Sequence, residues 1–206
     1  NYTIIKTQAY EEKIEAAIHM QNAMDILKKE AISRGYELDR TNDPNLTGLI
    51  GLSGSEITTS RGILSDKLVG LNPDFAAVFV ELLMDARIRK GDYVAVGLTG
   101  SNPGLNIALY SAIKTIGAKP VVITSVGSSM FGANRPDFTW LDMERILEEN
   151  GLIEFTSIAA SIGGNSDIGR GLPMENRELI IDNIYANDSE FISGNNLEEN
   201  IEERMK

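Results

Sequence analysis

The sequence contains no cysteine and only one histidine, His19, among its 206 residues. Without cysteine, the chain has no disulfide, no thiol nucleophile and no thiolate ligand for zinc or an iron–sulfur cluster. A single histidine also excludes a two-histidine zinc site and the H-E-x-x-H helix of metalloproteases. We therefore expect no metal site, and we expect His19 to have a surface or core role on a helix.

Basic side chains are also few, with 19 Lys and Arg against 30 Asp and Glu, which gives a formal net charge of −11. Nucleic acids and anionic membrane surfaces are bound through clustered Lys and Arg, so the charge argues against both as main partners. No apolar run approaches the roughly 18 residues that span a membrane. The length and the hydrophobic fraction of 42% are ordinary for one soluble, well-buried domain.

Helix-like and strand-like segments alternate through the middle of the chain. Three times a helical pattern ends at a glycine and a short apolar segment follows, over 93–98, 120–125 and 155–160. Strands that are separated by helices pair in parallel, and helices cover such sheets on both faces. We therefore predict an α/β fold: a three-layer, mostly parallel, Rossmann-like sheet with helices on both faces.

The two flanks of this region have a different character. Residues 10–34 carry apolar side chains at helical spacing, including Tyr10, Ile14 and Leu27, which predicts an amphipathic helix. From residue 189 the chain is polar and acidic, with a short helical pattern. We divide the chain into an N-terminal helix packed on or leading into the domain (1–40), an α/β domain (41–188) and an acidic tail (189–206).

Capping residues predict where several elements begin and end. An Asn-Pro pair supplies an N-cap and a proline for the first helical turn, and a glycine can end the helix in the left-handed conformation. Upstream, the apolar run over 46–52 predicts a buried strand. The expected helix starts and ends are Asn72-Pro73 with Gly91, Asn102-Pro103 with Gly117, and the capping box of Thr139 and Asp142 with Gly151.

Four loops rich in glycine and hydroxyl residues follow the predicted strands, after Leu52 and over 98–104, 125–136 and 161–172. Loops after parallel strands meet at one edge of the sheet, where open α/β sheets bind ligands. Glycines let the backbone approach a ligand, and hydroxyls with free helix amides stabilise an anion such as phosphate, sulfate or carboxylate. The candidate ligand-binding residues are Thr99, Gly100, Ser101, Asn102, Asn106, Ser125, Ser128, Ser129, Arg135, Asp167 and Arg170.

Arg135 has a functional and a structural interpretation. Its guanidinium group could clamp a carboxylate or phosphate through two hydrogen bonds, or it could pair with Asp137 or Asp142 nearby. The loop over 98–104 has neither the lysine of a P-loop nor the G-x-G-x-x-G spacing of a dinucleotide site. ATP and NAD are therefore not expected, and we predict no cofactor.

The residues alone do not decide whether the protein is an enzyme. No G-x-S-x-G elbow is present, and the only histidine base would be His19, far upstream of the loop serines. A serine–lysine pair through Lys114 or Lys119 is an alternative to which no motif points. A loop serine acting as a nucleophile in a hydrolase or transferase is one of the function classes that we keep.

Two family resemblances bear on the ligand. The order of strand, small-residue loop, helix and a strand ending in V-V-I-T-S is similar to phosphosugar-binding domains of the sugar isomerase fold. Longer strings resemble the bacterial poly-gamma-glutamate system proteins, and they cover most of 49–185. These strings are G-D-Y-V-A-V-G-L-T-G-S-N-P-G-L-N-I-A, K-P-V-V-I-T-S-V-G-S-S-M-F-G-A-N-R-P-D-F-T-W-L-D-M-E and S-I-A-A-S-I-G-G-N-S-D-I-G-R-G-L, with I-T-T-S and N-P-D-F-A-A-V upstream.

The second resemblance implies an accessory or binding role in the synthesis, export or attachment of the poly-gamma-glutamate capsule. The strand-end loops would hold a small anionic, carboxylate-bearing ligand such as a glutamyl chain end, and the partners would be other synthesis and export components. The first resemblance implies the alternative, a phosphosugar-binding or isomerase-like protein.

The resemblance to poly-gamma-glutamate system proteins also bears on location and assembly. It implies a bacterial protein that is membrane-associated at full length, with the side of the membrane open. Because the sequence begins at Asn1 rather than Met, we expect a segment upstream. The apolar stripe of the helix over 10–34 could also pack against a second copy of the chain, so a homo-oligomer is an alternative.

Overall fold

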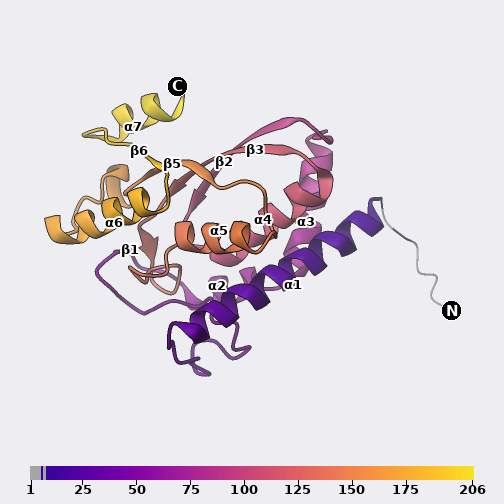
Figure 1. Ribbon diagram of the computed structural model, residues 1–206, viewed down its shortest axis with the longest axis horizontal. Coiled ribbons are helices and arrows are strands. Elements are labelled where there is room, and N and C mark those ends of the chain that lie inside the picture. Colours follow the sequence, from indigo (N-terminus) through magenta and orange to yellow (C-terminus); the bar gives the residue numbers. More distant parts are fainter. Residues whose placement is uncertain (1–5, 7) are drawn as a thin grey trace.

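Four parallel strands form the central sheet, in the order β2-β3-β5-β6. A computed structural model describes residue 6 and residues 8–206 (Figure 1). The strands of the central sheet are β2 (Tyr93–Thr99), β3 (Lys119–Ser125), β5 (Ser157–Ser161) and β6 (Glu190–Phe191). A second, two-stranded parallel sheet pairs β1 (Thr58–Ser60) with β4 (Ser128–Ser129).

Helices flank the central sheet, so the expected Rossmann-like, three-layer α/β fold is confirmed. Figure 1 shows the long helix α1 crossing below α4 and α5, and α7 at the opposite side of the molecule. None of the helices in the described part of the chain is both long and apolar enough to cross a membrane. The helices are α1 (Tyr10–Ser33), α2 (Leu64–Gly70), α3 (Asp74–Asp85), α4 (Pro103–Ile116), α5 (Trp140–Glu149), α6 (Met174–Ala186) and α7 (Leu197–Arg204), with a 3-10 turn at Asn165–Asp167.

The main core lies between the sheet and the helices α1, α3, α4 and α5. Val96 and Val122 face it from neighbouring strands, and each large aliphatic side chain buried there contributes about 1.5–3 kcal/mol. Helix α1 buries a stripe that includes Met20 and Leu27. The expected stripe was partly wrong, because Tyr10 and Ile14 are 39% and 45% exposed.

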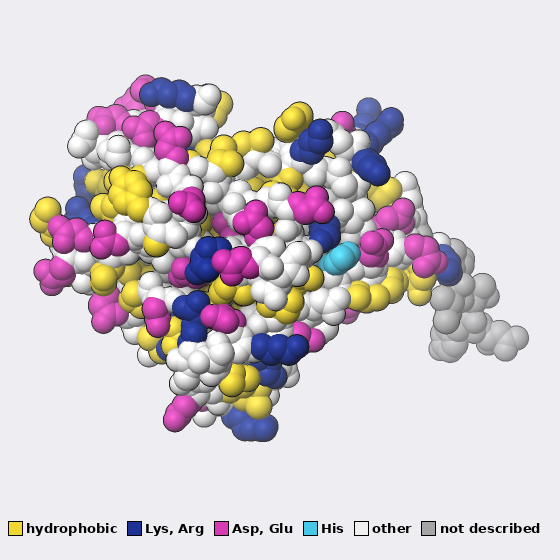
Figure 2. Space-filling model, viewed as in Figure 1, with side chains coloured by type: hydrophobic (Ala, Val, Ile, Leu, Met, Phe, Trp, Pro, Cys, Tyr) yellow, Lys and Arg dark blue, Asp and Glu magenta, His cyan; other side chains and the backbone are white. Residues whose placement is uncertain are grey.

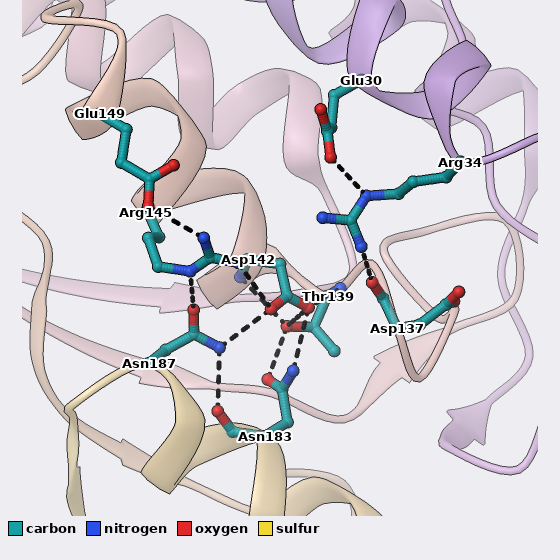
Figure 3. A network of polar contacts seen from close by, with 9 residues as sticks. All are labelled: Glu30, Arg34, Asp137, Thr139, Asp142, Arg145, Glu149, Asn183 and Asn187. Carbon is teal, nitrogen blue, oxygen red and sulfur yellow. Dashed lines mark hydrogen bonds and ion pairs between the residues drawn. The ribbon is translucent and has the colours of Figure 1, made fainter.

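A smaller core supports the loops at the carboxyl ends of the strands. It joins the loop after β3 to β5, α5 and α6 through seven buried apolar residues, Ile57, Val126, Leu141, Ala160, Ile162, Ile180 and Ile184. Beside it, a polar network fastens α5 to α6 (Figure 3). The expected capping box is present, because Thr139 N donates to Asp142 Oδ2 at 2.8 Å and Asp142 N donates back to Thr139 Oγ1. Asn183 of α6 and Asn187, the C-cap of α6, donate to the same carboxylate.

The opposite face of the sheet is covered less completely. Near the strand starts, Tyr93 is 75% exposed and Ile158 is 59% exposed. At the carboxyl ends, α7 lies against this face, because Arg204 contacts Ser125 and Ser161. The strand ends therefore lie beneath a short helix, whereas the remainder of that face stays open.

Two expected boundaries were wrong. Residues 46–52 form no strand: Leu46 and Gly48 have φ angles of 51° and 74°, outside the range of an extended strand. The segment instead runs beside the loop after β4, where Phe131 N donates to Leu52 O at 2.8 Å. Helix α3 ends at Asp85 rather than close to Gly91, because Arg87 takes the left-handed conformation with a φ of 62°.

His19 lies on α1, with Nε2 3.7 Å from Glu15 Oε1 and 27% of its side chain exposed. It is the only cyan side chain on the face of the molecule in Figure 2. The expected place of this histidine on a helix is confirmed, at a partly buried position.

Candidate functional site

Three hydroxyl residues stand in register at the last positions of neighbouring strands. Thr99 of β2 pairs with Ser125 of β3, and Ser125 pairs with Ser161 of β5. The Oγ atoms of Ser125 and Ser161 are 3.2 Å apart. Because the pairing is parallel, the three side chains lie on the same face of the sheet.

Two of these residues, Ser125 and Ser161, form a cluster with Asp167, Asn200 and Arg204, called here the strand-end cluster. Arg204 Nη2 lies 2.8 Å from Asp167 Oδ2, 2.7 Å from Ser161 Oγ and 3.2 Å from Ser125 Oγ. Ser161 Oγ donates to Asp167 Oδ1 at 2.6 Å, and Asn200 Nδ2 donates to Asp167 O at 2.9 Å. The cluster therefore joins two strand ends, one loop and α7.

Asp167 is held in place by an unusual backbone. Ser166 and Asp167 both have a φ of 59°, a left-handed conformation that costs a residue other than glycine about 1–3 kcal/mol. The side chains of Asp167 and Arg204 are only 12% and 22% exposed. Loss of one partner would leave the other charge poorly solvated, which would lower the free energy of unfolding.

A cavity of about 470 Å³ adjoins the cluster between the open sheet face and α7. This volume lies within the range of about 300–1,000 Å³ typical of small-molecule sites. Val121, Ile123 and Ile158 contribute apolar surface. Arg204 and Lys206 contribute positive charge, and Glu190 and Glu203 contribute negative charge. Figure 2 shows that acidic side chains also gather over α7.

Lys67, Ser101 and Ser129 form a second group, called here the buried lysine cluster. Lys67 is 8% exposed, and its Nζ donates to Ser101 O at 2.6 Å and to Ser129 Oγ at 2.9 Å. Ser129 N donates to Ser101 Oγ at 3.0 Å. Burial lowers the pKa of Lys67, so the neutral amine is more accessible than it is for a lysine in water.

Hydrogen bonds join the loop after β2 to the loop after β3. Ser128 Oγ donates to Gly100 O at 3.1 Å, and Asn106 Nδ2 donates to Thr99 O at 2.9 Å. A Cβ atom on Gly100 would lie 2.6 Å from Val126 O, so this glycine permits close contact between the loops. Asn102 is the N-cap of α4, but its side chain makes no cap hydrogen bond.

The two candidate arginines lie apart from both clusters. Arg135 stacks over the ring of Tyr36, with Cζ 4.3 Å from the ring centre, and it lines a different cavity. The alternative pairings of Arg135 are not seen: Arg145 approaches Asp142, and Arg34 donates to the Asp137 carbonyl (Figure 3). Arg170 is exposed and makes no side-chain hydrogen bond with the residues that the structure describes.

Sequence reasoning missed four residues of these clusters: Lys67, Ser161, Asn200 and Arg204. Ser161 had a usable signal, because it ends a strand in the same way as Ser125 does. Arg204 is the one basic residue within α7, but its contact with Ser125 spans 79 positions of sequence. Lys67 carries no local signal.

Comparison of the chain with protein-family models, with curated proteins and with solved structures gives no match.

Proposed function

We propose that this chain is an accessory, ligand-binding component of bacterial poly-gamma-glutamate synthesis or export. It holds a carboxylate-bearing ligand at the ends of β3 and β5, next to α7. The observation that supports this most is the position of Arg204, which contacts the hydroxyls of Ser125 and Ser161 and also lines the cavity of about 470 Å³.

Arg204 retains donors for a ligand. Its contacts with Asp167, Ser161 and Ser125 all use Nη2, and Nε and Nη1 make no hydrogen bond with the described residues. Nε and Nη1 point to different sides of the guanidinium group, so a ligand carboxylate in the cavity would accept one charge-assisted hydrogen bond from one of them. Lys206 would add a second positive charge.

The charge of the protein favours a chain end over a long polymer. A formal net charge of −11 repels a polyanion, and α7 itself carries several glutamates. One glutamyl end group contributes few charges and would bind near Arg204 and Lys206, away from Glu190 and Glu203 of the same lining. Membrane association at full length and contact with other export components belong to the same proposal.

The test is thermal stabilisation by matched ligands. A ligand at 100 times its Kd stabilises the native state by about 2.7 kcal/mol. We expect γ-glutamyl-glutamate and longer γ-glutamyl oligomers to raise the melting temperature, and glucose 6-phosphate and fructose 6-phosphate to have no effect. Stabilisation by the sugar phosphates alone would instead support the phosphosugar-binding alternative.

The buried lysine cluster favours a second candidate function, a hydrolase or transferase. Here Ser129 Oγ would attack an amide carbonyl of the polymer, and Lys67 Nζ would take the serine proton and pass it to the leaving amine. Water or an acceptor amine would then release the acyl group from Ser129. The serine–lysine pair of this mechanism is not one of those considered from sequence, since Lys114 Nζ donates to Leu152 O and Lys119 lies over Tyr93.

Access to Ser129 limits this second function. Ser129 is 6% exposed, and Gly62 packs so closely that a Cβ there would lie 3.2 Å from Ser129 Oγ. Prolonged incubation with poly-gamma-glutamate tests the candidate by polymer length. Shortening that is lost in Ser129→Ala and retained in a Ser53→Ala control, at an exposed position, would support catalysis, and unchanged length would reject it.

A further inference from the structure

A second cavity, of about 190 Å³, lies between the connection from α1 to β1 and the loop after β4. It is separate from the strand-end cluster, and none of the cluster residues lines it. Its volume is that of about six water molecules, which suits a ligand much smaller than a typical drug. Its polar lining includes Tyr36, Glu37, Asp39, Asn42, Asp43, Ser53 and Arg135.

Asp43 is the most unusual residue of this cavity. It is 3% exposed, and its Oδ2 accepts hydrogen bonds from Gly48 N at 2.8 Å and Thr47 Oγ1 at 3.0 Å. Its Oδ1 is buried and has no hydrogen-bond partner among the residues that the structure describes. A buried carboxylate oxygen without a donor carries a desolvation penalty that a bound cationic donor would remove.

Tyr36 holds the cation of this cavity in place. Its hydroxyl group is buried, and the residue lines the same cavity. Burial raises the pKa of Tyr36, and the interaction of the hydroxyl with the Asp137 carboxylate raises it further, so the hydroxyl keeps its proton. The ring of Tyr36 is therefore neutral where Arg135 stacks on it.

The charges around the cavity restrict the occupant further. Three carboxylates line it, those of Glu37, Asp39 and Asp43, together with one guanidinium group, that of Arg135. The guanidinium group is oriented by its stacking on Tyr36. Among the described residues, no group of three or more metal-type side chains could hold a metal ion. The lining therefore suits an organic ammonium group near Asp43 and an anionic group near Arg135.

We infer that this cavity binds a small zwitterion of the amino-acid class. The ammonium group of the ligand donates to Asp43 Oδ1, and its carboxylate accepts from the Arg135 guanidinium group. The site is independent of the proposed function, because it shares no residue with the strand-end cluster. It gives Arg135 the carboxylate-binding role expected from sequence, but in a different cavity and with a different partner.

The experiment titrates the protein with L-alanine and L-glutamate as zwitterionic probes, with acetate and methylamine as single-charge controls. Two-dimensional NMR follows the backbone amides of Gly48 and Gly51, which line the cavity. We expect saturable shifts with the zwitterions and at least about tenfold weaker binding of either single-charge compound. Absence of saturable shifts, or the same shifts with Ca²⁺ alone, would overturn the inference.

Two variants locate the binding to these side chains. Asp43→Asn keeps an oxygen for Gly48 and Thr47 and removes the charge, so we expect at least about tenfold weaker binding with the fold retained. Asp182→Asn, at an exposed position of α6, is the matched charge control. Arg135→Gln, with exposed Arg170→Gln as its control, provides a second pair if Asp43→Asn does not fold. Wild-type affinity in a folded Asp43→Asn or Arg135→Gln variant would overturn the assignment.

Discussion

Replacement of Glu144 by alanine should destabilise the fold severely. This carboxylate is 1% exposed on α5, and it accepts hydrogen bonds from the Tyr110 hydroxyl, from Trp140 Nε1 at 2.7 Å and from Ser157 N at 3.0 Å. It thereby ties α4, α5 and the start of β5 together. Glu144→Ala leaves these three buried donors without an acceptor.

The expected loss can be worked out from these contacts. Each unsatisfied buried donor costs about 1–3 kcal/mol, so three cost about 3–9 kcal/mol. The whole free energy of unfolding of a domain is about 5–15 kcal/mol. Urea unfolding followed by the fluorescence of Trp140, the only tryptophan, would measure the change. Glu149→Ala is the matched control, because Glu149 is 57% exposed and pairs only with Arg145 (Figure 3). A loss below 1 kcal/mol for Glu144→Ala would refute the reasoning.

We also predict that the contribution of Glu144 to stability depends on pH. Burial raises the pKa of Glu144 above its ordinary value of 4.5, although its hydrogen bonds act in the opposite direction. The folded state therefore binds a proton more readily than the unfolded state does. The raised pKa of Glu144 therefore adds to the free energy of unfolding. This addition is present in full below the pKa of the unfolded state and is lost as the pH rises through the pKa of the folded state. The advantage of wild type over Glu144→Gln should thus be greatest at low pH and shrink as the pH rises, and the opposite trend would contradict the shift.

Two further predictions concern the scaffold of the site. Gly104→Ala should destabilise by about 1–3 kcal/mol, because its Cβ would lie 2.5 Å from Gly70 O where α4 begins against α2. Gly97→Ala, with no atom within 4 Å of its Cβ, should be tolerated, and equal thermal unfolding of both variants would contradict this packing. Lys67→Met should unfold at lower urea concentration than wild type, because Ser101 O and Ser129 Oγ lose their donor. An unchanged midpoint would mean that this buried ammonium contributes no net stability.

The regular part of the fold could be predicted from sequence because its signals are local. The thrice-repeated glycine with an apolar segment after it predicted β2, β3 and β5 to within two residues, although only α4 of the preceding helices has such a glycine as its C-cap. The strands β1, β4 and β6 have only two or three residues, too few for a periodic pattern. The apolar composition of 46–52 predicted a strand, but Gly51 and Leu52 form hydrogen bonds with the loop after β4 and the run has no regular strand backbone.

The candidate site could be predicted only where topology determines it. Parallel pairing brings the ends of β2 and β3 together, so the proximity of Thr99 and Ser125 follows from the sheet. The contacts of Lys67 and Arg204 depend on how α2 and α7 pack, and no local pattern encodes that packing. The burial of Asp43 Oδ1 without a hydrogen-bond donor among the described residues likewise arises only in the folded chain.

The affinity of γ-glutamyl-glutamate for wild type and for Arg204→Gln, measured by isothermal titration calorimetry, tests the proposed role most directly. Arg170→Gln is the matched control, since it removes the same charge from an exposed position. If the strand-end cluster binds the carboxylate, Arg204→Gln should weaken binding about tenfold or more, and Arg170→Gln should leave it unchanged. Equal affinity in the wild type and in a folded Arg204→Gln protein, or no binding to the wild type, would contradict a carboxylate site at the ends of β3 and β5.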